Sequence, residues 1–166
     1  MKPKLTVICV FFLTWVLCPI VGGQVGILPK KDTQLKEVGD EKFRPGDVWT
    51  YKTREGEKNS HITVLKIESS SELGIIVHVA VDGIRLANCH GGPEPDNIPH
   101  MPFARRALEE SVTENIATGG QVPDYQEGYK EWRAAYEKKR AGIYIISVSD
   151  AIGVAEETYR KGAGCE

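Results

Sequence analysis

Apolar and polar side chains alternate along residues 74–86, and the rest of the predicted fold is built around this stretch. Asp82 and Gly83 divide it into two runs, and an Asp-Gly pair accepts the positive φ angles of a two-residue hairpin turn. Because side chains alternate across a strand, the valines are expected on one face and His78 with Arg85 on the other. The pattern therefore predicts a β-hairpin with one apolar face and one polar face.

Two earlier stretches, residues 48–53 and 61–68, show the same alternation and are joined by short polar links. Four strands in succession with short connections are typical of an antiparallel meander. Residues 88–99 follow with two glycines and three prolines, a density that predicts a loop. Its length is one at which surface loops begin to carry function.

The second half of the chain has helical periodicity. Apolar residues recur along one face of residues 102–117, and a second helix is expected from Asp124, which starts a capping box. The second helix has an aromatic stripe that is more typical of core than of a ligand platform: Tyr125, Tyr129, Trp132 and Tyr136. Residues 143–148 have strand character, and Ser147 can cap a last helix. The predicted class is α+β, an antiparallel sheet of a meander of about four strands and one later strand, with about three helices packed on one face.

The first residues have the pattern of a secretory signal. A short basic opening precedes the apolar run 5–21, and small residues follow before Gln24. A retained membrane anchor is the alternative, since the run is near the lower limit of length for crossing a bilayer. Lipid attachment at Cys18 is disfavoured because a large side chain precedes it. We expect a periplasmic or secreted protein in which residues 1–23 are a signal peptide, 24–42 an N-terminal arm and 43–166 a single domain.

Removal of the leader takes two lysines from the 21 basic residues and leaves 19 against 23 acidic ones, a net charge of −4. A mildly acidic chain without a basic block lacks the electrostatic pattern of nucleic-acid binders. It has no basic amphipathic helix, so a membrane contact is expected only through an uncleaved leader. No phosphate-binding glycine motif is present, and no cofactor is expected. The partner is expected to be a protein or a surface ligand.

Two of the four cysteines leave with the leader, and Cys89 and Cys165 remain. In an oxidising compartment, one disulfide between them is an alternative to two free thiols. Cys89, His90 and His100 also combine the sulfur and imidazole ligands that zinc or copper prefers. Their spacing matches no compact metal motif, so solvent-exposed loop residues are the alternative to a metal site.

His78 and Arg85 are candidate catalytic residues, with His100 as a third. A histidine beside an arginine and a carboxylate on one face of a sheet can act as a general base. The alternative is that helices cover this face and that His78 is a hydrogen-bonded residue of the core. No nucleophile motif such as G-x-S-x-G accompanies these residues.

Three short blocks resemble a family of small uncharacterised bacterial proteins: PGDVWTYKTREGE from Pro45, PHMPF from Pro99 and EGYKEWR from Glu127. The blocks span much of residues 45–148. The resemblance implies a bacterial source and a shared fold, but it carries no known activity and no functional residue.

The sequence favours an exported domain that binds another protein or a surface, in the manner of an inhibitor or an immunity protein. The alternatives are a small hydrolase that uses His78 and Arg85, and a metal-binding protein that uses Cys89, His90 and His100. A cleft in which histidine, arginine and carboxylate converge would favour the enzyme. Three ligands around one point would favour the metal protein, and an exposed apolar groove would favour the binding domain.

Overall fold

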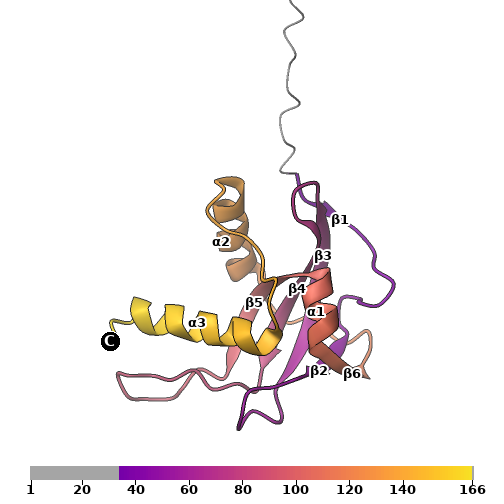
Figure 1. Cartoon of the computed structure of the whole chain (residues 1–166). Helices are drawn as coiled ribbons and strands as arrows, with labels where there is room; N and C mark the ends of the chain where they lie inside the picture. Colours follow the sequence, from indigo (N-terminus) through magenta and orange to yellow (C-terminus); the bar gives the residue numbers. More distant parts are fainter. Residues whose placement is uncertain (1–33, 166) are drawn as a thin grey trace, which may run out of the picture. The chain divides into compact units, whose positions relative to one another are not determined.

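The computed structural model describes residues 34–165, which form a six-stranded antiparallel sheet with three helices (Figure 1). The predicted α+β class is confirmed. The sheet order is β5-β4-β3-β2-β6, and β1 pairs with the second half of β3. The strands are β1 (Lys36–Glu37), β2 (Val48–Tyr51), β3 (His61–Ser70), β4 (Gly74–Asp82), β5 (Asn97–Ala104) and β6 (Val112–Ala117). The helices are α1 (Arg105–Ser111), α2 (Gln126–Glu137) and α3 (Val148–Gly162).

The predicted signal peptide, residues 1–23, lies outside the described residues, and so do Cys9 and Cys18. The predicted arm, residues 24–42, is described from residue 34 onward, and this part includes β1, which pairs with β3. None of the helices within the described part of the chain has the length and apolar character needed to cross a bilayer.

The predicted hairpin at Asp82 and Gly83 is wrong. β4 ends at Asp82, and the strand on its other side from β3 is the later β5, in which Pro102 lies opposite His78. Gly83 adopts a φ of +73°, and a Cβ at this position would lie 3.0 Å from the carbonyl oxygen of Asn59. Gly83 therefore turns the chain out of the sheet, because only a residue without a side chain accepts both this φ and this close approach.

Residues 102–117, predicted as one helix, divide into the end of β5, then α1, then β6. Two prolines in β5 made this segment resemble a loop and a helix start, but β5 is an edge strand, where proline is tolerated. β6 pairs with the open edge of β2, a long-range contact that local periodicity does not reveal. The predicted strand 143–148 forms a single bridge, between Phe103 and Tyr144. The last helix begins as predicted, with the Ser147 side chain accepting a hydrogen bond at its N-terminus.

The helices cover both faces of the sheet, so the prediction that they share one face is wrong. Val77 of β4 belongs to the main core, to which α1 and α3 contribute Leu108 and Ile152. Ile76, the neighbouring residue, belongs to a second core with Tyr136 of α2. Since adjacent residues of a strand point to opposite faces, α2 lies on the face opposite α1 and α3.

A bulge in β3 decides which side chains reach the α2 face. The pairing of β3 with β4 shifts between Val64 and Lys66, so that Val64 lies opposite Val79 while Lys66 lies opposite His78. After the shift the even-numbered residues of β3 face α2 instead of the main core. Lys66 and Glu68 therefore lie on the same face as His78.

Candidate functional site

Glu68 lies near the end of β3 and is only 2% exposed. The hydroxyl of Tyr129 lies 3.0 Å from each of its two carboxylate oxygens and donates a hydrogen bond to them. Lys66 Nζ lies 3.4 Å from Glu68 Oε1, and Arg133 Nη1 lies 3.9 Å from the same oxygen. One hydroxyl and two cations thus compensate the buried carboxylate, as burial of a charge requires.

A chain of polar contacts leads from Glu68 through His78 to His100. His78 is fully buried, and its Nε2 lies 3.2 Å from Glu68 Oε2, an ion-pair distance without the alignment of a good hydrogen bond. His78 Nδ1 and His100 Nε2 form a hydrogen bond of 2.9 Å, in which one ring donates and the other accepts. His78 is therefore a core residue that links a carboxylate to a second histidine.

Helix α2 covers this chain with aromatic side chains. The His78 ring packs edge-on against Tyr129 and Trp132, with ring centroids 5.3 and 5.0 Å away. Gly128 lets the helix approach β5, because a Cβ here would lie 3.0 Å from the Cβ of His100. The aromatic stripe predicted as core thus includes the buried Tyr129 and the half-buried Trp132.

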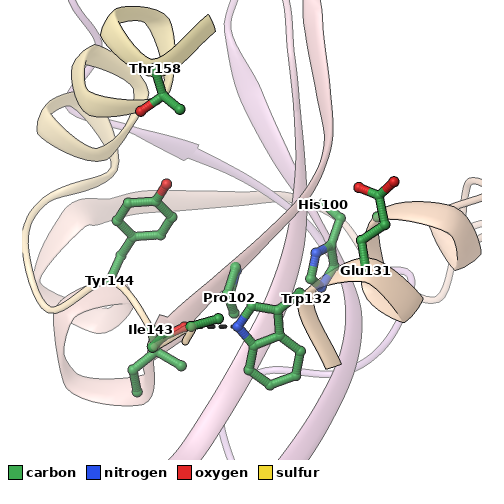
Figure 2. A pocket seen from close by; sticks show the side chains of 10 residues that line it. His100, Pro102, Glu131, Trp132, Ile143, Tyr144 and Thr158 are labelled. Carbon is green, nitrogen blue, oxygen red and sulfur yellow. Dashed lines mark hydrogen bonds between the residues drawn. The ribbon is translucent and has the colours of Figure 1, made fainter. Parts of the chain in front are cut away.

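A cavity of about 700 Å³ opens beside His100, the last residue of this chain of polar contacts (Figure 2). His100 and Pro102 of β5 line one side, and Trp132 of α2 lines another, with its Nε1 donating a hydrogen bond of 2.8 Å to the carbonyl of Gly142. Tyr144 comes from the segment before α3. The remaining lining residues are Gly128, Glu131, Ala141, Gly142, Ile143 and Thr158.

Burial changes the pKa values of Glu68 and His100, the two ends of this chain of polar contacts, in opposite directions. Burial by itself raises the pKa of the Glu68 carboxyl, but contacts from His78 and Tyr129 and the charge of Lys66 lower this pKa below its usual value. Burial lowers the pKa of His100 to about 4, and His78 acts in the same direction while Glu68 opposes it. At pH 7 the carboxylate is therefore charged and the imidazole of His100 is neutral.

The low pKa of His100 predicts a loss of stability in mild acid. Between pH 6.5 and about 4 the unfolded chain binds a proton at His100 that the folded chain does not, so the free energy of unfolding falls as the pH falls. The full shift corresponds to about 3 kcal/mol, and partial exposure of the ring reduces this to roughly 1–2 kcal/mol. Urea unfolding measured across this pH range should show the decline, and His100→Gln, which cannot titrate, should flatten it.

Glu68 acts in a separate pH window. Because its pKa is lowered on folding, its contribution to stability is complete above the ordinary pKa of 4.5 and is lost only as the pH falls through the lower folded value. Measurements between pH 5 and 7 thus separate the effect of His100 from that of Glu68. An equal slope for the wild type and His100→Gln in that interval would contradict the prediction.

Arg85 is not brought to His78. Its backbone N–H donates to Glu57 Oε1 at 2.9 Å, and its carbonyl accepts from Arg54 Nη2 at 3.0 Å. Arg54 also forms an ion pair with Glu156 of α3 at 2.6 Å. The prediction that Arg85 lies on the same face of the sheet as His78 depended on the hairpin. It is wrong because the chain leaves the sheet after Asp82.

Cys89 and Cys165 form a disulfide, with their Cα atoms 5.9 Å apart. The sulfur and imidazole atoms of Cys89, His90 and Cys165 lie within 4.8 Å of one another. His100, the third metal candidate predicted from the sequence, instead contacts His78 beneath α2. The structure therefore groups the predicted metal ligands differently, with a cysteine of the C-terminal tail in the place of His100.

Glu68 is the site residue that sequence reasoning missed. A signal was present, because Glu68 lies two residues before the end of β3 and β4 follows after a short turn. In an ideal antiparallel register the two strands could be aligned from that turn, but the bulge between Val64 and Lys66 changes which face each residue takes. The carboxylate and the histidine therefore could not be assigned to one face beforehand.

Comparisons with protein-family models, with curated proteins and with solved structures find no match for this chain. Its function is therefore inferred from the geometry and charge of the site.

Proposed function

We propose that this protein is an exported binding domain whose cavity receives a cationic group, the side chain of a lysine or arginine on a partner protein. The charge of the cavity carries this proposal. Glu131 contributes a carboxyl group to the lining, and His100 is neutral at pH 7 because its pKa is about 4. Among the lining residues that the structure describes, none is a lysine or an arginine. A positive group would therefore meet attraction and no positive neighbour.

The walls of the cavity offer contacts for both parts of a lysine or arginine side chain, the apolar methylene groups and the charged end. Trp132 and Tyr144 provide aromatic rings, whose faces attract a cation. Pro102 and Ile143 provide apolar surface against which the methylene stem of a lysine or arginine packs. An aromatic, apolar and singly acidic cavity thus combines the features that recognise organic cations.

A binding role is favoured over the hydrolase. A general base works best with a pKa near the operating pH, and the pKa of His100 is about 4. His78 is fully buried and cannot meet a substrate. Among the described residues of the lining, only Tyr144 and Thr158 carry hydroxyl groups, and the Thr158 hydroxyl donates to the carbonyl of Val154 at 2.9 Å. An activated nucleophile would need a neighbouring base in place of this helix carbonyl.

The proposal predicts selectivity for charge. Short peptides with one lysine or arginine should bind more tightly, by about tenfold, than matched peptides with norleucine or citrulline, as measured by calorimetry. Trp132→Leu, which keeps apolar bulk but removes the indole, should weaken binding of the lysine peptide by about two- to thirtyfold. Glu131→Gln should weaken it by a few-fold. Butylammonium distinguishes the sources of the cation, because weak binding of it beside tight binding of the peptide indicates a protein partner.

Glu127→Gln is the matched control for Glu131→Gln. Both carboxylates belong to α2 and are exposed, but Glu127 does not line this cavity. The control should bind the lysine peptide as the wild type does. Equal affinity for charged and neutral peptides, or an equal effect of the two glutamine substitutions, would contradict the proposed function.

A further inference from the structure

We propose that Cys89, His90 and Cys165 form a zinc site that is closed by the disulfide and opens when the disulfide is reduced. This site is separate from the cavity beneath α2, and the proposal does not depend on the function proposed for that cavity. Its residues come from the loop after β4 and from the tail that follows α3.

The three ligand atoms are already close to the positions that zinc requires. The two sulfurs and an imidazole nitrogen of His90 all lie within 4.8 Å of one another. A tetrahedral zinc ion with Zn–S bonds of about 2.3 Å holds two sulfurs about 3.8 Å apart. A disulfide holds its two sulfurs about 2 Å apart, so after reduction they need to separate by only about 2 Å to admit the ion. Side-chain rotation and movement of the chain end can supply this shift.

The loop is shaped so that adjacent residues can ligate together. The side-chain oxygen of Asn88 accepts a hydrogen bond of 3.1 Å from the backbone of His90, and its amide donates to the carbonyl of Gly91 at 3.0 Å. Gly91 and Gly92 have φ angles of +75° and +98°, which side chains rarely adopt. This turn lets the sulfur of Cys89 and the ring of His90 face the same point.

The C-terminal tail is directed to that point as well. The Nε2 of His90 forms a hydrogen bond with the carbonyl of Ala163, two residues before Cys165. Gly164, with a φ of +75°, then turns the chain toward Cys89. This hydrogen bond between the loop and the tail places the imidazole beside the segment that carries Cys165.

The chemistry of opening balances with a thiol reductant. A dithiol gives two electrons and two protons to the disulfide, the S–S bond breaks, two thiols form, and the reductant becomes a disulfide. Zn²⁺ then forms two Zn–S bonds and one Zn–N bond, and two thiol protons are released. A water molecule would complete the tetrahedron, since the cluster supplies three ligands.

The test uses the full chain with Cys9→Ser and Cys18→Ser, so that only Cys89 and Cys165 carry sulfur ligands of this type. A phosphine, which does not compete for zinc, reduces the disulfide and takes its oxygen from water. Co²⁺ then serves as a spectroscopic probe, followed by displacement with Zn²⁺. The reduced chain should bind one Co²⁺ with thiolate-to-metal absorption and the d–d bands of a tetrahedral site, and the oxidised chain should bind none.

His90→Ala separates a three-ligand site from a simple pair of thiols. It should weaken Co²⁺ binding by about tenfold or more, because removal of even an outer-shell partner of a metal site has this effect. It should also change the d–d bands, whereas His61→Ala, on β3, should change neither. His90 is exposed, so its replacement does not disturb the core. Equal metal binding by the oxidised and reduced chains, or wild-type affinity in His90→Ala, would overturn the proposal.

Discussion

Replacement of Glu68 by alanine is expected to lower the free energy of unfolding by about 3–5 kcal/mol, the loss typical when one partner of a buried ion pair is removed. The Tyr129 hydroxyl would lose both of its acceptor oxygens, and the fully buried His78 would lose the carboxylate 3.2 Å from its Nε2. Lys66 would lose its ion pair with Glu68 and keep the one with the exposed Glu37. Urea unfolding followed by circular dichroism measures the loss.

One further variant measures a part of this effect, and a second variant is its control. Tyr129→Phe removes one hydroxyl and should cost about 1–2 kcal/mol, because Glu68 keeps its other partners. Glu110→Ala is the control, since this carboxylate is 63% exposed and pairs only with Arg106 on the surface of α1. It should leave stability nearly unchanged. If Glu68→Ala were no more destabilising than Glu110→Ala, the polar chain would not be a structural element.

Loss of the disulfide is expected to have the second-largest effect. The bond joins Cys89 to Cys165 across a sequence separation of 76 residues, so it removes considerable freedom from the unfolded chain. Cys89→Ser with Cys165→Ser should therefore lower the free energy of unfolding by about 2–4 kcal/mol under oxidising conditions. The shift in the urea midpoint at constant slope gives the value.

The same double variant supplies its own control under reducing conditions. A reductant should bring the wild type to the stability of the variant and should not change the variant itself. Zinc added to the reduced wild type should restore part of the stability if the metal site proposed above forms, because a ligand that binds only the folded state stabilises it. Equal stability of the oxidised and reduced wild type would contradict this prediction.

The surroundings of the buried His78 could be predicted only in part. Alternation in residues 74–82 predicted that His78 and the valines lie on opposite faces of the strand. The structure has this arrangement, with Val77 in the main core and His78 on the face covered by α2. The partner strand was mispredicted because an Asp-Gly pair is a strong hairpin signal, whereas β5 is sequence-distant and contains prolines. Arg85 was therefore predicted to lie beside His78, where the structure does not place it.

The aromatic stripe of α2 shows where local patterns suffice and where they do not. Helical spacing predicts that Tyr129 and Trp132 share a face, and in the structure both pack against His78. The pattern does not say that the Tyr129 hydroxyl meets a carboxylate from β3, or that Trp132 lines a cavity. Those contacts depend on how closely α2 approaches the sheet, which Gly128 permits.

By itself, the sequence determined the class of the fold, the alternation of side chains along β4 and the helical face of α2, because these follow from side-chain periodicity within a few residues. Only the tertiary structure decided the pairing of β4 with β5, the helices on both faces, and the contact between Glu68, His78 and His100. The physical reason is that strand pairing joins residues distant in the chain, and the single bulge in β3 changes which side chains face each other.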